Sequence, residues 1–75
     1  MQDNKNKYEL AFGYLMAKTR RTKGLTQAEV AELLGITQAY YSQLENAQRS
    51  IDLYLAVKAC KTLGIDLNEF SRIYE

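Results

Sequence analysis

The sequence predicts a compact all-α domain built from five short helices. Its 75 residues contain no proline, and no stretch alternates apolar and polar residues as a strand with one buried face would. Apolar residues recur instead at three- and four-residue spacing, in segments that follow threonine or aspartate and end at glycine. A chain of this length forms one domain at most, so the helices are expected to share one core.

The first helix is expected from about Lys7 to Lys23. It would follow a flexible N-terminus of residues 1–6 and open a single helix-turn-helix domain of residues 7–75. Helical spacing gives it one inward face, which consists of Phe12, Met16 and Thr19. Gly24 can then adopt the left-handed conformation that ends the helix.

The second helix is expected to begin after Thr26 and to be short. The Thr26 side chain can accept a hydrogen bond from the backbone of Glu29 while the Glu29 carboxylate reaches back, which is a capping box. Gly35 ends this helix. Its inward stripe comprises Val30, Ala31 and Leu34.

Thr37 is the predicted N-cap of a third helix that runs from Gln38 to about Asn46, with Tyr41 and Leu44 facing inward. A turn at residues 35–37 would set the second and third helices at roughly 90 to 120° to each other. The third helix would then protrude, as in a helix-turn-helix. Two capped helices around a glycine turn also occur in ordinary bundles, so the geometry alone does not establish this motif.

The last two helices are predicted from a second pair of caps. Asp52 can cap a fourth helix that Gly64 ends, and Asp66 with Glu69 forms a second capping box before a short fifth helix. The fourth segment carries the apolar residues Leu53, Ala56, Val57, Cys60 and Leu63. The fifth carries Leu67, Phe70 and Ile73.

The composition argues against catalysis and against a metal or disulfide that stabilises the fold. The chain has no histidine and one cysteine, Cys60, which is expected to be a small buried apolar residue. No nucleophile is paired with a base and no glycine loop could hold a phosphate, so neither an enzyme nor a cofactor is expected. No apolar run approaches the roughly 20 residues that span a bilayer, and the polar start is unlike a secretory signal. A cytoplasmic protein is therefore expected.

The charge is nearly balanced, with ten Lys and Arg against nine Asp and Glu and a formal net charge of +1. This total gives no general case for binding nucleic acid. Within six residues that contain no acid, however, the chain places Lys18, Arg20, Arg21 and Lys23. They predict a local positive patch, although a solvated helix end favoured by the helix dipole would explain the same residues.

Several short motifs together resemble one known family. They are Arg20, Lys23-Gly24-Leu25-Thr26-Gln27, Ala31, Leu34-Gly35-Ile36-Thr37, Gln38, Ser42, Leu44-Glu45-Asn46, Arg49, Leu63-Gly64-Ile65 and Leu67-Asn68-Glu69-Phe70. From about Phe12 to Ile73 the chain is similar to the lambda-repressor-like helix-turn-helix domains of the Cro and phage-repressor type, also called the XRE family. The resemblance implies a five-helix domain whose third helix enters the major groove, usually as a two-fold dimer on a palindromic operator.

The chain departs from that family at a few positions. Glycine is common after the recognition helix and proline a few residues later, where this chain has Ala47 and Ile51. A branched aliphatic residue is usual in place of Tyr41, and leucine in place of Thr19. The loop before the fourth helix is therefore expected to differ from the family pattern. A larger ring beside a smaller partner would conserve core volume if the two side chains touch.

The outward face of the third helix is expected to read bases. Gln38 stands at its start, where its amide can donate to N7 and accept from N6 of adenine. Ala39 can touch a thymine methyl group, and Gln43, one turn further on, can reach a base edge or a phosphate. The alternative is that these side chains are simply solvated.

Other residues are expected to contact the DNA backbone or to support the fold. Gln27 begins the second helix, where backbone amides and the helix dipole favour a phosphate, and the resemblance implies such a clamp. Further candidates for backbone contacts are Thr37, Tyr40, Lys18 and Arg49. Arg20 and Glu45 match family positions that form an ion pair between the first helix and the recognition helix.

The expected partners are a double-stranded DNA operator, as an inverted repeat, and a second copy of the chain. Part of the terminal helix can face a second subunit or pack on the first helix, through Leu67, Phe70, Ile73 and Tyr74. The leading hypothesis is a transcription regulator, most often a repressor in this family. A phage-type repressor, a restriction-modification controller and an antitoxin stay open, as does a cognate toxin or antirepressor as partner. The alternative is a protein-interaction module that keeps the fold without binding DNA.

Overall fold

The computed structural model describes the backbone of residues 3–74 and the side chains of residues 7–73. The helices in chain order are α1 (Asp3–Thr22), α2 (Gln27–Leu34), α3 (Gln38–Glu45), α4 (Leu53–Leu63) and α5 (Leu67–Tyr74). No strand occurs between residues 3 and 74, and the predicted all-α, five-helix class is confirmed.

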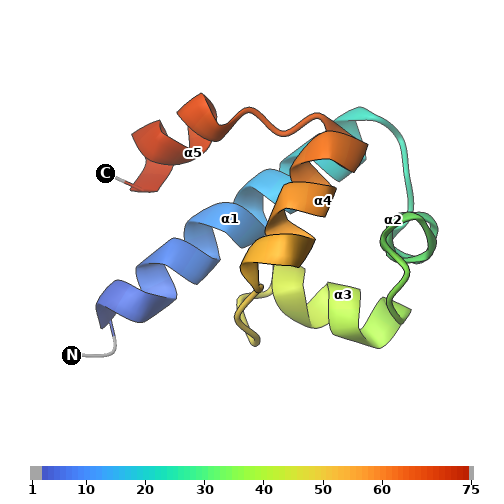
Figure 1. The fold of residues 1–75 in the computed structure, drawn as a ribbon, viewed down its shortest axis with the longest axis horizontal. Coiled ribbons are helices and arrows are strands. Elements are labelled where there is room, and N and C mark those ends of the chain that lie inside the picture. Colours follow the sequence, from blue (N-terminus) through green and yellow to red (C-terminus); the bar gives the residue numbers. More distant parts are fainter. Residues whose placement is uncertain (1–2, 75) are drawn as a thin grey trace.

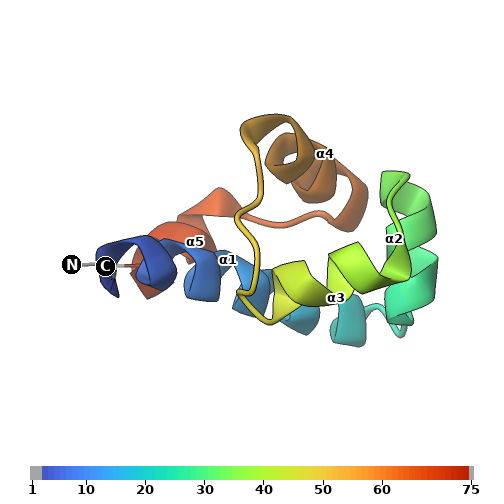
Figure 2. The same cartoon turned by 90° about the horizontal axis from the view of Figure 1, so that it is seen from below.

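The long helix α1 forms the axis around which the others are arranged. α5 lies along its N-terminal part and α2 lies beyond its C-terminal end (Figure 1). α3 packs against both α1 and α2, and α4 contacts the same two helices. Seen from below, α3 lies across the near side of the molecule with α4 beside it (Figure 2). One face of α3 is thus left open to solvent while its other face is held by two helices.

A single apolar core fills the space between the helices. All the residues expected to point inward from the second and third helices are buried, while Thr19 on α1 is half-buried. The core consists of Phe12, Leu15, Met16, Val30, Ala31, Leu34, Tyr41, Leu44, Ile51, Leu55, Ala59, Leu63 and Ile65. The α2–α3 pair is therefore fixed by burial on its inner side.

The first helix begins earlier than the sequence pattern indicated. α1 starts at Asp3, four residues before Lys7, and ends at Thr22. Neither glycine nor proline interrupts the stretch between Asp3 and Lys7, and an acidic residue in a first turn is favoured by the helix dipole. Local propensity therefore extends the helix beyond the part that its apolar spacing identifies.

The buried face of α4 is not the stripe that the sequence emphasised. Leu55, Ala59 and Leu63 point into the core, whereas Leu53 is 78% exposed and Val57 is 47% exposed. Cys60 is half-buried rather than buried. Because Ile51 before the helix and Ile65 after it are also buried, they fix the rotation of α4 and leave its second apolar stripe outside the core.

The start of α5 also differs from the expectation. The Asp66 carboxylate accepts a hydrogen bond from the backbone N–H of Asn68 at 2.9 Å, but the Glu69 carboxylate does not reach back to complete a capping box. Glu69 instead forms an ion pair with Lys18 on α1. An opposite charge on a neighbouring helix has thus drawn Glu69 away from the cap.

Gly13 lies at a close approach of α1 to the C-terminal end of α3. A Cβ atom built there would be 2.7 Å from the carbonyl oxygen of Glu45 and 2.8 Å from that of Leu44. Both neighbours are backbone atoms, so they cannot move aside as a flexible side chain would. The missing side chain of Gly13 therefore sets how deeply the C-terminal end of α3 sits on α1.

The N-terminal half of α1 also holds the loop between α3 and α4. The Tyr8 hydroxyl donates a hydrogen bond to the carbonyl oxygen of Ile51 at 3.1 Å, and the Ser50 hydroxyl donates to the buried Glu9 carboxylate. In the same loop Ala47 has a φ of 59°, in the left-handed region. The turn that the related family commonly makes with glycine is thus made here by alanine, at a strain of roughly 1–2 kcal/mol.

Candidate nucleic-acid interface

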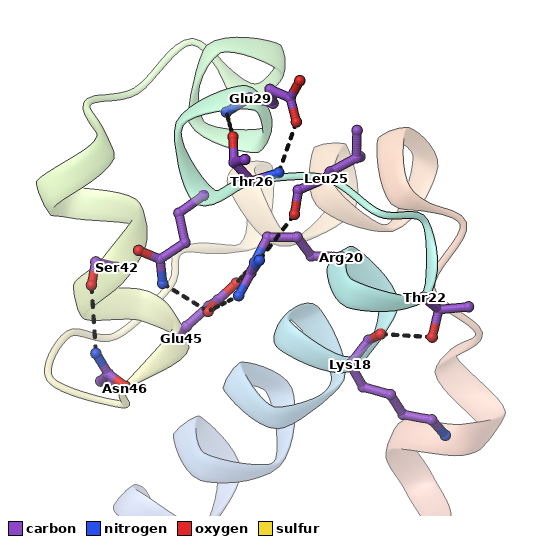
Figure 3. A network of polar contacts seen from close by, with 10 residues as sticks. Lys18, Arg20, Thr22, Leu25, Thr26, Glu29, Ser42, Glu45 and Asn46 are labelled. Atoms are coloured by element: carbon purple, nitrogen blue, oxygen red, sulfur yellow. Dashed lines mark hydrogen bonds and ion pairs between the residues drawn. The ribbon is translucent and has the colours of Figure 1, made fainter.

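Local capping fixes where α2 begins. The Thr26 hydroxyl accepts from the backbone N–H of Glu29 at 3.0 Å, and the Glu29 carboxylate accepts from the backbone N–H of Thr26 at 2.7 Å (Figure 3). The predicted capping box is confirmed. Gly35 then ends α2 with a φ of 75°, a conformation that costs a residue with a Cβ atom far more than it costs glycine.

The same device fixes the start of α3, the exposed helix of the pair. The Thr37 hydroxyl accepts from the backbone N–H of Tyr40 at 3.1 Å. Tyr41 and Leu44, one turn apart, are buried, and they fix the rotation of α3 about its axis. Ala39 consequently lies on the outer side, and Gln38, at the first position of the helix, is exposed as well.

A buried ion pair ties the C-terminal end of α3 to α1. The Arg20 guanidinium donates from Nε to Glu45 Oε2 at 2.6 Å and from Nη2 to Glu45 Oε1 at 3.2 Å (Figure 3). Its Nη1 donates to the carbonyl oxygen of Leu25 at 3.0 Å, in the loop between α1 and α2. Only 3% of the Glu45 side chain and 13% of the Arg20 side chain are exposed. Arg20 therefore connects three segments, and its donors are directed inward rather than toward a ligand.

Gln27 joins this ion pair from the start of α2. Its Nε2 donates to Glu45 Oε1 at 3.0 Å, and the residue is half-buried. One amide hydrogen of Gln27 is thus held by Glu45, and the other is left to donate. The candidate for a phosphate clamp is at the same time a part of the α2–α3 support.

The pKa values of the groups around Glu45 follow from this arrangement. Burial by itself would raise the pKa of the Glu45 carboxyl, but the hydrogen bond from Arg20, the nearby Tyr41 hydroxyl, the hydrogen bond from Gln27 and the charge of Arg20 outweigh it and lower that pKa. The hydrogen bond to Glu45 raises the pKa of Arg20. Burial, and then the nearby Glu45 carboxylate, raise the pKa of Tyr41. The pair is therefore charged at neutral pH and the phenol beside it is neutral.

The Tyr41 hydroxyl is buried without a partner. No donor or acceptor between residues 7 and 73 reaches it with hydrogen-bond geometry. Such an unpaired buried group typically costs about 1–3 kcal/mol. The ring of Tyr41, which stands where the family usually has a branched aliphatic side chain, fills the core without gaining a bond for its hydroxyl.

Arg49 organises the second half of the outer face of α3. Its Nε donates to Gln43 Oε1 at 2.7 Å, and its guanidinium carbon lies 5.0 Å from the centre of the Tyr40 ring. Gln43 and Tyr40 are half-buried, while Arg49 is exposed. The three side chains thus form one connected group beside the exposed Gln38 and Ala39.

The predicted positive patch is reduced by pairing inside the molecule. Lys18 is engaged by Glu69 and Arg20 by Glu45, so that Arg21 and Lys23 stay as exposed cations of that stretch. The hydrogen bond that Lys18 donates to Glu69 raises the pKa of Lys18. Half of the patch therefore serves to hold α5 and α3 on α1.

The candidate dimer residues on the terminal helix divide into two groups. The Phe70 ring packs edge-to-face on Phe12, with centroids 5.9 Å apart, and on Tyr8, with centroids 6.2 Å apart. Phe70 is thus used to dock α5 on α1, whereas Leu67 and Ile73 are exposed. The side chain of Tyr74 lies outside the residues that the structure describes.

Other kinds of site find no support in the described part of the chain. Between residues 3 and 74 no helix is long and apolar enough to cross a membrane. No three His, Cys, Asp or Glu side chains come together there in a way that would hold a metal ion.

Comparison with known proteins identifies the α2–α3 pair. A family model described as Helix-turn-helix matches residues 16–70, which include both helices and the residues that connect them. The chain belongs to the Cro/C1-type helix-turn-helix family. The resemblance inferred from the sequence motifs is thereby confirmed.

Two relatives of this helix-turn-helix protein are each 38% identical to it. YqaF from Bacillus subtilis (strain 168) matches over 55 residues, which are 73% of this chain and 72% of the relative. The protein y4dJ from Sinorhizobium fredii (strain NBRC 101917 / NGR234) matches over 53 residues, which are 71% and 69%. Both are named uncharacterized HTH-type transcriptional regulators. No solved structure gives a significant match.

Sequence reasoning missed two contacts of this helix-turn-helix. The bond from Gln27 to Glu45 joins residues 18 apart, and no local pattern relates those two positions. The bond from Arg49 to Gln43 crosses the end of α3, where a left-handed Ala47 turns the chain back. Glycine would have been the usual signal for such a turn, and alanine does not provide it.

Proposed function

We propose that this protein binds double-stranded DNA in a sequence-specific manner through the outer face of α3 and thereby regulates transcription. One observation carries the proposal: α3 presents polar, uncharged side chains to solvent while caps, buried residues and an ion pair fix it from behind. A helix held in this way can enter a major groove without rearranging first. Family membership and the names of the relatives support the same function.

The proposed base-reading residues are Gln38, Ala39 and Gln43. Gln38 is exposed at the start of α3, so its amide can pair with N6 and N7 of adenine, and the Ala39 methyl group can contact thymine. Gln43 is more restricted, because its carbonyl oxygen already accepts from Arg49. Its NH₂ group is then the part that faces a base, which suits acceptors such as guanine O6 and N7 or thymine O4.

The proposed backbone contacts surround these residues. Gln27 has one amide hydrogen left for a phosphate, and the N-terminus of α2 offers further N–H groups. The Arg49 guanidinium, placed over Tyr40, has its two terminal nitrogens left for a second phosphate. Thr37 uses its hydroxyl as a cap acceptor and Lys18 is paired with Glu69, so we assign both a smaller share of the binding.

We further propose a homodimer that acts as a repressor on an inverted repeat. A single short helix without Lys or Arg is expected to hold one half-site weakly, and two linked copies would bind together. In a two-fold dimer the recognition helices should lie roughly 34 Å apart, one turn of the double helix. A dimer bound in this way would block other proteins from the same groove, which is the basis for proposing repression.

Selection of bound sequences from a random duplex pool tests the function most directly. The expected outcome is an enriched inverted repeat, together with weaker binding to unselected duplex that falls as salt rises. Failure to enrich any sequence, combined with no salt-dependent binding to random duplex, would contradict DNA binding. The neutral outer face of α3 would then favour the alternative, a protein-interaction module that keeps the fold.

Replacement of Gln38 and Gln27 by alanine should separate base reading from backbone contact. Gln38→Ala is expected to leave stability nearly unchanged and to cost roughly 1–3 kcal/mol of discrimination at one base pair of each half-site. Gln27→Ala is expected to weaken specific and random binding alike. It should also lower the free energy of unfolding by about 1–2 kcal/mol, because the bond to Glu45 is lost.

Binding to the selected operator, to single-base variants and to random duplex measures these effects, at a temperature where thermal melts show each variant folded. Asn68→Ala, which removes an exposed amide from α5, is the matched control and should bind like the parent. If Gln38→Ala and Gln27→Ala also bind every duplex like the parent, the proposed roles of both glutamines are wrong.

A further inference from the structure

The face of α4 that the core leaves uncovered is an apolar stripe with regular helical spacing. It is made of Leu53, Ala56, Val57 and Cys60, at positions i, i+3, i+4 and i+7, and we call it the α4 seam. Residues with this spacing lie along one side of a helix, as they do where two helices pack lengthwise. Leu63, which continues the spacing along the chain, is buried.

The seam is exposed and shaped to receive apolar atoms. Leu53 and Val57 are 78% and 47% exposed, and Leu67 at the start of α5 adds a third large apolar side chain that is 59% exposed. Together with Lys61 these residues line a groove of about 180 Å³. An exposed apolar surface that follows one helix over two turns is typical of an interface rather than of isolated surface residues.

The charges at the two ends of the seam indicate what covers it. Asp52 caps the N-terminal end of α4, Lys61 lies in the last turn, and no acidic residue occurs within the helix. If a second α4 packs antiparallel, each Lys61 comes to the level of the partner's Asp52. That carboxylate also offsets the positive end of the partner's helix dipole. A parallel pair would instead bring like charges together at both ends.

We propose that the α4 seam is the surface through which two copies of this chain associate, with the two α4 helices antiparallel. This inference rests on the homodimer of the proposed function and names the surface that forms it. A two-fold axis near Ala56 and Val57 brings Leu53 of one copy to the level of Cys60 of the other. The stripe is thus complementary to itself, as a two-fold interface requires.

The location of the seam agrees with simultaneous binding of DNA. α4 stands beside α3 rather than across its open side (Figure 2), so pairing through α4 leaves Gln38 and Ala39 uncovered. The terminal helix is a weaker candidate, because Phe70 is already used against α1. Two turns of helix bury less surface than a standard protein interface, so we expect dissociation constants in the micromolar range without DNA.

Sedimentation equilibrium of the full chain without DNA tests the seam. The parent should be a dimer at concentrations of tens of micromolar, and Val57→Glu, which places two carboxylates near the two-fold axis, should raise the dissociation constant by about 100-fold or more. Leu33→Glu on α2 is the matched control, because Leu33 is a similarly exposed apolar residue, 52%, outside the seam. Ile73→Glu tests the terminal helix. Both of these variants should stay dimeric.

The proposal would be overturned if the parent stayed monomeric at 100 µM, or if Val57→Glu dimerised like the parent. It would also be overturned if Leu33→Glu or Ile73→Glu dissociated the dimer as strongly as Val57→Glu. If Val57→Glu fails to fold by circular dichroism, Leu53→Glu at the most exposed seam position takes its place. Failure of the proposed function is a different result, namely a dimeric parent that binds no duplex. A parent that binds an operator but does not dimerise through α4 would instead contradict the seam proposal and leave the proposed function standing.

Discussion

Replacing Gly13 by alanine should lower the free energy of unfolding by about 2 kcal/mol, the opposite of what this change does in most helices. In the middle of a helix, alanine is ordinarily more stable than glycine by about 1 kcal/mol. Here the new Cβ atom would lie 2.7 and 2.8 Å from two carbonyl oxygens at the end of α3. Overpacking against backbone typically costs about 1–3 kcal/mol or more, so the clash outweighs the gain in propensity.

Urea unfolding followed by circular dichroism measures this effect. Leu10→Ala, at an exposed position of the same helix, is the control for a general response of α1 and should change stability little. Relief of the clash requires α3 to move away from α1, so Gly13→Ala should also lose affinity for a selected operator. A melting temperature higher than that of the parent would show that the approach of the two helices is not tight.

Removal of Glu45 should be the most destabilising single change in the polar network, with an expected loss of about 3 kcal/mol for Glu45→Ala. The reason is that the Arg20 guanidinium would stay largely buried without its acceptor and the half-buried Gln27 would lose its hydrogen-bond partner. Arg20→Ala should cost a similar amount, and the double variant should lose less than the sum of the two. Strict additivity in denaturant melts would show that the two residues do not interact.

Tyr41→Phe is the matched control for these variants. It changes a residue beside the ion pair but removes only a hydroxyl that has no hydrogen-bond partner among the described side chains. Stability is therefore expected to stay the same or to rise by about 1 kcal/mol, since the cost of the unpaired group disappears. A large loss would show that the hydroxyl is bonded to Glu45 in solution.

The same ion pair predicts how stability responds to acid. The pKa of Glu45 is lower in the folded chain than in the unfolded chain, where a carboxyl of this type titrates near 4.3. The stabilisation is therefore fully present above that value and is lost as the pH falls through the lower pKa of the folded state. Melting temperatures measured from pH 7 to pH 3 should show a steeper decrease for the parent than for Glu45→Gln. Parallel curves would contradict a lowered pKa.

The parts of the fold that could be predicted from the sequence are those that neighbouring residues determine. Thr26 with Glu29 specifies the start of α2 within four positions, and Gly35 and Gly64 mark helix ends through their own conformations. The rotation of α4 could not be predicted in this way, because two of its faces are apolar. Which of them is buried depends on how Ile51 and Ile65 enter the core, and that is a property of the assembled helices.

The candidate site shows the same division. The outward position of Ala39 follows from the helical period once Tyr41 and Leu44 are placed inside, whereas Gln38, three residues before Tyr41, is exposed because it stands at the first position of the helix. The orientations of the Gln27 and Gln43 amides could not be predicted from spacing, because each amide is oriented by a residue that only folding brings near. Glu45 accepts a hydrogen bond from the Gln27 amide, and Arg49 donates a hydrogen bond to the amide oxygen of Gln43.

The way α3 is anchored also bears on how such a regulator can evolve. Tyr41 and Leu44 secure the helix from within, whereas Gln38 and Ala39 are exposed and make no side-chain hydrogen bond within residues 7–73. Mutations at these two outer positions are then nearly neutral for folding, so that under the proposed function natural selection can act on them through target choice alone. A duplicated copy of the gene could thus acquire a new target site in a few steps, without a compensating mutation elsewhere in the domain.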